Sequence, residues 1–366
     1  MSLYQFIIKH FKTISFFTGF ITDLLILPKT TSPYYIWVGP TNIGIILTLL
    51  FIRQAVAGNL VKRTKKLKKQ VKVSQETKEN KTFEELKTPG YKRIEKATKW
   101  GTFWVSFFLG TLLSNTMVYY FRSSDVIQMW PIFLIILIAI IFNEFLFGTV
   151  PDTILFYIGL TFYFIFNVPI VINKVNTYTF FVSILISVLA TSILTLFLQR
   201  IYLSRKDFIL LIIFSIFFPF LLLRLYFINY IPAVPLALGD SGFYSYVEKV
   251  GDNYTKEEIG LVEKKEYFIF NNNYYDLNTI KNTGVYFFSS IISPANVSAD
   301  ITHTWEKYDN EKKIWIKQAE IGYPISGGRE SGYRGYTQIN NISQGEWRVR
   351  VLADGRLIGL KKILIY

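Results

Sequence analysis

The chain has 366 residues, of which 51% are hydrophobic and only 18% are charged, so it is not a single soluble globule. Its formal net charge of +14 is concentrated in one segment. Residues 53–99 hold 15 Lys and Arg against 5 Glu, whereas residues 232–366 hold 16 basic and 16 acidic side chains. A local excess of Lys and Arg beside apolar segments is typical of a cytoplasmic loop in a membrane protein. The location of the positive charge therefore argues against nucleic acid as a partner. The chain has no cysteine, which excludes disulfides and thiolate metal sites.

Apolar segments follow one another through residues 1–230 and predict an α-helical multi-pass membrane domain of about seven transmembrane helices. The first segment, residues 13–27, is short and carries Asp23. No small-residue cleavage site follows it, so we expect an uncleaved helix. The six later segments are each about 19 to 24 residues long, enough to cross a hydrocarbon core of roughly 30 Å. They cover residues 34–57, 100–121, 129–147, 153–172, 178–198 and 208–227.

The distribution of basic residues predicts the orientation of these helices. Residues 59–99 form a strongly basic loop that should be cytoplasmic and should contact the anionic surface of the lipid bilayer. Successive loops lie on alternate sides of the membrane, so the loop that contains Arg205 is also expected on the cytoplasmic side. The short loop around Asp152 is expected on the same side, although it carries no basic residue. Residues 231–366 are then extracytoplasmic, and the expected location is the cell (inner) membrane.

The last third of the chain predicts an antiparallel β-sandwich of immunoglobulin-like type. Pro232 and Pro235 open a linker that cannot continue a helix. Apolar and polar residues then alternate in short runs separated by turn residues, and Asp354-Gly355 is a strong hairpin signal. The predicted strands are residues 266–270, 285–292, 301–308, 314–321, 347–352 and 357–365.

The search for catalytic and cofactor motifs gives no candidate. The two histidines are His10, beside the first apolar segment, and His303. Residues 239–242 read Gly-Asp-Ser-Gly, as around the nucleophile of chymotrypsin-like proteases, but the required base is missing and a linker turn explains them better. We therefore expect no metal and no cofactor, and the motifs favour a protein that is not an enzyme without excluding the membrane-embedded enzyme given below as the alternative.

Residues 327–336 are the most unusual stretch of the predicted sandwich, because they combine glycines with Arg329, Tyr333 and Arg334. Exposed backbone N–H groups and an arginine fork could hold an anion or a glycan. The alternative is a loop whose arginines brace the sandwich through carbonyl hydrogen bonds. His303 shares a strand face with Trp305, where a packed core role is the alternative to ligand contact.

Four polar residues lie in the predicted spans: Asp23, Asn143, Glu144 and Arg224. An ionisable side chain at the bilayer centre costs roughly 2.5 to 3.5 kcal/mol on insertion scales, and less toward the interface. Glu144 lies close to the cytoplasmic boundary, so an interfacial or helix-contact role competes with a role as a proton or ion relay.

The C-terminal region resembles a bacterial family known as domain of unknown function 2914. The resemblance covers residues 285–366 and rests on His303-Thr304-Trp305, residues 321–329, 332–336 and 345–349, and the glycines of the final hairpin. It implies a domain that follows a multi-helix membrane region, and it implies no established activity.

The leading hypothesis is a membrane-anchored extracytoplasmic binding module. In it, residues 327–336, His303, Trp305 and Trp347 face an envelope glycan, peptide or protein partner. The alternative is a transporter or membrane-embedded enzyme in which Asn143 and Glu144 act and the sandwich is an accessory.

Overall fold

The computed structural model describes fourteen stretches of the chain, and all structural statements below concern these stretches. They are residues 10–26, 35–76, 87–123, 130–145, 149–201, 203–231, 233–251, 253–259, 261–267, 270–275, 284–293, 297–326, 332–340 and 342–365. The chain forms two compact units. A helical unit comprises Met1–Val118, Phe133–Tyr163 and Ile186–Phe220, and a mixed unit comprises Tyr119–Ile132, Phe164–Leu185 and Leu221–Tyr366.

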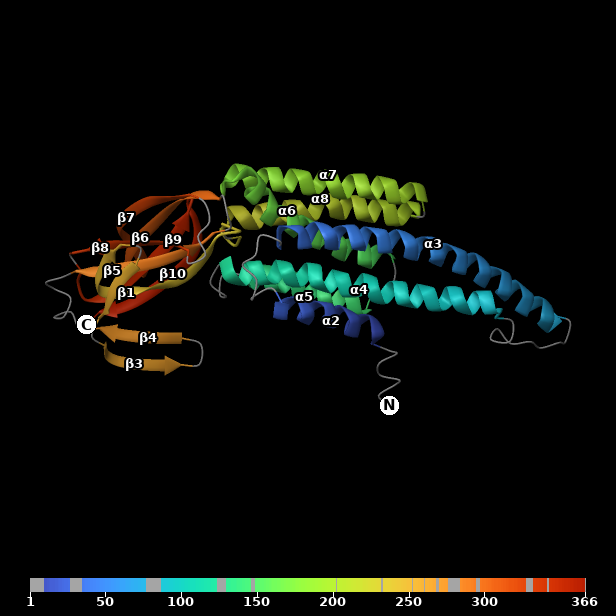
Figure 1. Cartoon of the computed structure of the whole chain (residues 1–366), viewed down its shortest axis with the longest axis horizontal. Coiled ribbons are helices and arrows are strands. Elements are labelled where there is room, and N and C mark those ends of the chain that lie inside the picture. The colour runs from blue at the N-terminus through green and yellow to red at the C-terminus, as the bar shows by residue number, and fades with distance from the viewer. Residues whose placement is uncertain are drawn as a thin grey trace. The chain divides into compact units, whose positions relative to one another are not determined.

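Helices occupy the first two thirds of the chain (Figure 1). They are α2 (Phe11–Ile26), α3 (Tyr35–Glu76), α4 (Pro89–Ser123), α5 (Trp130–Phe145), α6 (Thr149–Ile172), α7 (Thr177–Ile201) and α8 (Arg205–Phe227). Among the described residues, three helices are long and apolar enough to cross a membrane: Val150–Ile172, Thr177–Arg200 and Arg205–Phe227. The apolar parts of α3 and α5, Gly39–Arg53 and Trp130–Ala139, are shorter. A membrane association is therefore supported, while the number of seven spans stays a prediction.

The basic segment predicted as a cytoplasmic loop is largely helical. The helix α3 continues through it to Glu76, and α4 begins at Pro89. Its Lys, Arg, Gln and Glu side chains are strong helix formers, so the helix does not end where the apolar sequence ends. Asp152, predicted in a loop, lies in the first turn of α6.

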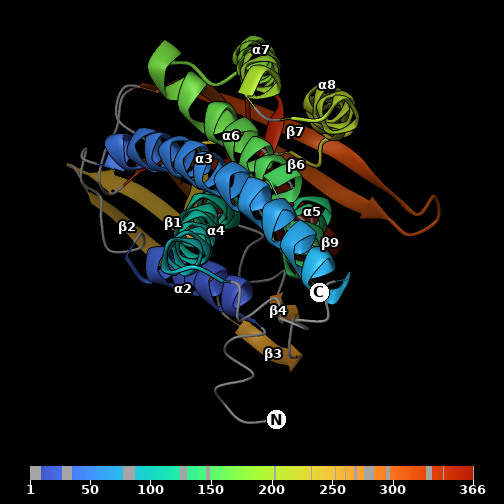
Figure 2. The ribbon, with the colours of Figure 1, turned by 90° about the vertical axis from the view of Figure 1, so that its right-hand side faces the viewer.

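Two glycines bring α2 and α4 into backbone contact within the helical unit, and both views show these helices side by side (Figures 1 and 2). A Cβ at Gly19 would lie 2.0 Å from the Phe107 carbonyl oxygen, and one at Gly110 would lie 2.1 Å from that of Phe16. Small residues allow such close packing between apolar helices.

The mixed unit contains ten strands among the described residues, arranged in two sheets. They are β1 (Ala237–Val250), β2 (Asn253–Glu258), β3 (Leu261–Tyr267), β4 (Phe270–Tyr275), β5 (Val285–Ile292), β6 (Ser298–Asp309), β7 (Ile314–Ser326), β8 (Tyr333–Ile339), β9 (Gly345–Ala353) and β10 (Arg356–Ile365). One sheet has the order β2-β1-β5-β8, and the other β3-β4-β10-β9-β6-β7. Neighbouring strands pair antiparallel except β4 with β10, which are parallel.

The two sheets share one hydrophobic core, which contains Phe287 of the smaller sheet together with Trp305 and Val351 of the larger. The predicted hairpin between β9 and β10 is confirmed, with positive φ values of 44° at Asp354 and 76° at Gly355. The prediction missed β1, β2 and β8, and it placed a single strand at residues 266–270, where β3 ends and β4 begins. The error at β8 matters for function, because residues 333–336 were predicted as loop and instead pair with β5.

The connection between α6 and α7 also belongs to this core. Ser298, at the start of β6, donates its backbone N–H to the Asn173 carbonyl at 3.1 Å and accepts from the Val175 N–H at 3.3 Å. Val175 is 5% exposed and packs in the core of the two sheets. The predicted domain boundary after residue 230 stays a prediction, but the compact unit that holds the strands also includes this helical connection.

Candidate functional site

Three of the predicted ligand contacts are core residues. His303 and Trp305 are 0% exposed and Trp347 is 2% exposed, so none of these side chains can meet a ligand at the surface. Period-two alternation along β6 turns His303 and Trp305 inward with Ile301, as the alternative interpretation of the sequence proposed. The hypothesis that they face a ligand is thereby corrected.

His303 is the centre of a buried polar network that connects the two sheets. Its Nε2 lies 2.8 Å from Ser289 Oγ, and its Nδ1 lies 3.1 Å from Thr337 Oγ1. Trp305 Nε1 donates to the same Thr337 oxygen at 3.0 Å. Because the indole can only donate, the simplest order has Thr337 donating to Nδ1 and the protonated Nε2 donating to Ser289.

The environment of this network favours uncharged side chains. Burial lowers the pKa of His303 from 6.5 to about 4. Burial raises the pKa of Tyr323 to about 12, against the opposing effect of a hydrogen bond with Ser289 at 3.1 Å. Both Ser289 and His303 are 0% exposed, so a substrate has no path to this Ser–His pair. The network therefore connects the two sheets inside the core.

Gly335 provides the space for Tyr323 beside this network. A Cβ at residue 335 would lie 2.6 Å from the Tyr323 ring. Gly335 is the register partner of Ser289, so the absence of a side chain there allows Tyr323 to reach Ser289 across the sheets.

Three of the predicted ligand contacts are arginines or tyrosines. The structure describes Tyr333 and Arg334, and Arg329 lies outside the described residues. The Tyr333 hydroxyl donates to the Ser326 carbonyl. Arg334 is half-buried, and its guanidinium carbon lies 5.4 Å from the centre of the Tyr254 ring. Tyr254 in turn donates its hydroxyl to the Arg334 carbonyl at 2.9 Å. Arg334 thus joins an aromatic surface that the sequence analysis did not identify.

That surface, here called the tyrosine face, lies on the side of the smaller sheet opposite to Phe287. It consists of Tyr244, Tyr246, Tyr254, Tyr286, Phe288 and Tyr336. Consecutive ring contacts connect all six, with centroid separations between 5.4 and 6.3 Å. Such separations are typical of edge-to-face and tilted packing, so the rings form one preorganised surface. Tyr246 and Tyr336 are the most accessible, at 39% and 38% exposure, whereas Phe288 is 2% exposed and lies beneath the Lys256 amine.

Charged groups on the tyrosine face are matched with one another. The Lys256 amine lies 4.5 Å from the centre of the Phe288 ring and forms an ion pair with Asp240 at 2.5 Å. Burial is the largest single influence and would lower the pKa of Lys256, but the hydrogen bonds and charges of Asp240 and Tyr244 together outweigh it, so the net shift of the pKa is upward. A hydrogen bond with Glu248 raises the pKa of Tyr246, so its phenol remains neutral at physiological pH.

The signal for this surface was present in the sequence. Residues 285–288 read Val-Tyr-Phe-Phe and residues 243–246 read Phe-Tyr-Ser-Tyr, so each run places aromatic residues at successive positions. Alternation on a strand sends Phe287 and Phe243 to the core and the neighbouring tyrosines to the other face. Recognition of β1 as a strand would have revealed it.

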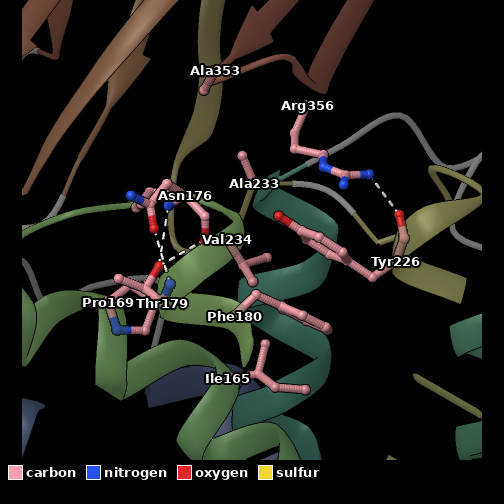
Figure 3. Close-up of a pocket in the computed structure, with 11 residues that line it drawn as sticks. Ile165, Pro169, Asn176, Thr179, Phe180, Tyr226, Ala233, Val234, Ala353 and Arg356 are labelled. Atoms are coloured by element: carbon pink, nitrogen blue, oxygen red, sulfur yellow. Dashed lines mark hydrogen bonds between the residues drawn. The ribbon is translucent and has the colours of Figure 1, made fainter. Parts of the chain in front are cut away.

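A small cavity lies among the ends of helices and strands in the mixed unit (Figure 3). Asn176, Thr179, Tyr226 and Arg356 give it polar groups, and Phe180 lies stacked on Tyr226 with 3.9 Å between ring centroids. Its volume of about 10 Å³ suits roughly one water molecule and is far below that of a small-molecule site. We therefore interpret it as a packing defect between Arg356 and the helix ends.

The remaining predicted residues lie in the helices and in β1. Asp23, Asn143 and Glu144 lie in α2 and α5, but their side chains are outside the described residues. Arg224 is exposed in the last turn of α8. Residues 239–242 lie in β1, where Asp240 pairs with Lys256. The described residues contain no cluster of His, Asp and Glu that could hold a metal ion.

Residues 298–362 match the family model described as protein of unknown function (DUF2914). This segment is a DUF2914 domain. The match confirms the resemblance seen in the sequence. The DUF2914 segment begins at the first residue of β6 and reaches into β10, and it contains His303, Trp305, Tyr323 and Thr337 of the buried network. Comparisons with curated proteins and with solved structures gave no match.

The DUF2914 segment covers only part of the tyrosine face. Tyr336 and Arg334 lie within it, whereas Tyr244, Tyr254 and Tyr286 come from strands that precede it. The family description assigns no activity, so a functional interpretation depends on the geometry of the surface itself.

Proposed function

We propose that the chain is a membrane-anchored binding protein of the cell envelope, and that its tyrosine face recognises a glycan chain. The observation that carries this proposal is the unbroken series of six aromatic rings on one face of the β2-β1-β5-β8 sheet. Monomeric proteins rarely expose contiguous apolar surface without a function.

The chemistry of the tyrosine face supports a glycan over a charged polymer. Sugar rings present C–H groups on their faces and hydroxyl groups at their edges. Tyrosine offers the complementary pattern, because its ring is apolar and its hydroxyl group can form hydrogen bonds at the solvent-exposed end. The cation Lys256 is already paired with Asp240, so Lys256 is not free to select an anion.

The location outside the cytoplasm is part of the same proposal. It includes about seven spanning helices, cytoplasmic placement of the basic residues 59–99, and an immunoglobulin-like sandwich on the opposite side. The three membrane-length apolar helices and the shared core of two sheets support this arrangement. In this view the helices anchor the β region and no enzyme chemistry is required.

The test uses the full chain in detergent and measures its co-sedimentation with purified peptidoglycan and its binding of soluble uncharged oligosaccharides. The double variant Tyr246→Ala, Tyr336→Ala should bind at least about tenfold more weakly, because it removes the two most accessible rings. Tyr308→Ala is the matched control, since Tyr308 also packs in a ring pair, with Trp315 at 5.1 Å on the other sheet. Failure of the native chain to bind either probe, or equal binding by the double variant, would overturn the proposal.

A further inference from the structure

A buried ionic cluster lies in the helical unit, apart from the tyrosine face. Asp152, in the first turn of α6, forms ion pairs with Lys12 of α2 and Arg53 of α3. The Lys12 amine lies 2.7 Å from one carboxylate oxygen, and Arg53 Nη1 contacts the other. The exposed fractions of the three side chains are 4% for Lys12, 6% for Arg53 and 1% for Asp152.

Arg53 has donor capacity that the described residues do not use. Its Nη2 is buried and has no hydrogen-bond partner among them, although the guanidinium group is always charged. A buried donor without an acceptor is costly, and the cost is larger for a charged group. Asp152 Oδ2 accepts from Nη1, and Nη2 lacks an acceptor among the described residues.

The backbone at this position also favours an anion. Asp152 lies at the N-terminal end of α6, where the helix dipole and the first N–H groups create a positive potential. The described cluster contains two cations and one carboxylate.

Neighbouring side chains place the cluster at the boundary between apolar and polar surroundings. Arg53 is the last residue of the apolar part of α3, Gly39–Arg53. It packs against Gly101 of α4, where a Cβ would lie 3.3 Å from the Arg53 side chain. The adjacent Trp100 and Trp104 are 49% and 43% exposed. Exposed tryptophans that follow an apolar segment are typical of the headgroup level of a membrane.

We propose that the Lys12–Arg53–Asp152 cluster is a binding site for a single phosphate-type anion, held by Arg53 Nη2 and the positive end of α6. The same chemistry fits the phosphate group of an anionic lipid and a free phosphate ion. The headgroup level favours the lipid, since the inner surface of a membrane is rich in anionic lipids. This inference does not depend on glycan recognition by the tyrosine face.

The experiment measures lipid retained by the full chain, purified in detergent, after exposure to phosphatidylglycerol or phosphatidylcholine. Native mass spectrometry counts the bound lipid, and a parallel titration uses inorganic phosphate. Arg53→Gln should lower phosphatidylglycerol retention about tenfold, whereas Lys206→Gln, which alters an exposed charge at the start of α8, should not.

Asp152→Asn separates an anion site from a purely structural ion pair. Removal of the carboxylate should strengthen phosphatidylglycerol retention, because it raises the positive charge of the site, even if the variant is less stable. A structural ion pair would give lower stability with unchanged retention. Unchanged retention in both Asp152→Asn and Arg53→Gln overturns the proposal. Equal retention of the two lipids overturns it when inorganic phosphate does not bind either, and assigns the site to a free anion when inorganic phosphate does bind.

Discussion

His303 makes the clearest structural contribution of a single residue, because its two ring nitrogens connect the smaller sheet, at Ser289 and Thr337, with β6. Because His303 is buried, it does not contact a ligand at the surface, and its protonation state affects the stability of the fold. An uncharged imidazole fits the network, while a charged one in this core would lose its hydration.

Acidification should therefore destabilise the β region through His303. The unfolded chain binds a proton as the pH falls below about 6.5, whereas the folded state resists protonation until about pH 4. The stabilising contribution is fully present above pH 6.5 and is lost as the pH falls to 4. The loss should amount to about 3 kcal/mol in the free energy of unfolding, measured by hydrogen exchange of β5 and β6 amides.

The control is His303→Gln, which keeps a donor near the Nε2 position and cannot titrate. The difference between the native chain and this variant isolates His303, because all other groups titrate alike in both. A pH dependence between 4 and 6.5 that persists unchanged in the variant would contradict the assignment.

At the scale of the element, sequence reasoning succeeded where one local signal dominates. The strand β5 and the Asp354-Gly355 hairpin were predicted correctly, because alternation and turn chemistry agree there. It failed at β8, where glycines and arginines read as a loop although the segment pairs with β5. Pairing between β8 and β5 joins segments far apart in sequence, and no local pattern contains that information.

A contact between two elements leads to a second prediction. Arg356, the first residue of β10, places its guanidinium carbon 3.8 Å from the centre of the Tyr226 ring near the end of α8. It also donates to the Tyr226 carbonyl at 2.6 Å and to Asn229 Oδ1 at 2.7 Å, and Figure 3 shows the first of these contacts. Arg356→Lys should cost about 1–2 kcal/mol, since an ammonium group cannot stack on the Tyr226 ring as the planar guanidinium does.

The measurement is thermal unfolding of the full chain combined with protease cleavage between α8 and β1. We expect a lower midpoint and faster cleavage for Arg356→Lys. Arg205→Lys, at the exposed start of α8, serves as the matched control. Equal midpoints and cleavage rates in the three proteins would show that the stacked arginine does not stabilise this connection.

At the scale of the whole molecule, composition and charge distribution predicted the division into a helical and a β-rich region, and the DUF2914 resemblance was confirmed for residues 298–362. Composition and charge distribution could not predict which surface of the β region is the candidate for binding. Trp305, Trp347 and His303 are prominent in the sequence but lie in the core, while the tyrosine face depends on neighbours supplied by four strands. Burial and cross-strand pairing are properties of the fold. A sequence pattern therefore identifies unusual residues as site candidates but does not show whether they are exposed.

The arrangement across the membrane is the central claim, and the absence of cysteine makes it directly measurable. Single cysteines at Glu311, in the exposed β6–β7 turn, and at Lys66, in the basic part of α3, are treated on intact cells with a membrane-impermeant maleimide. We expect labelling of Glu311→Cys before lysis and of Lys66→Cys only after lysis. Labelling of Lys66→Cys on intact cells together with protection of Glu311→Cys would contradict the account.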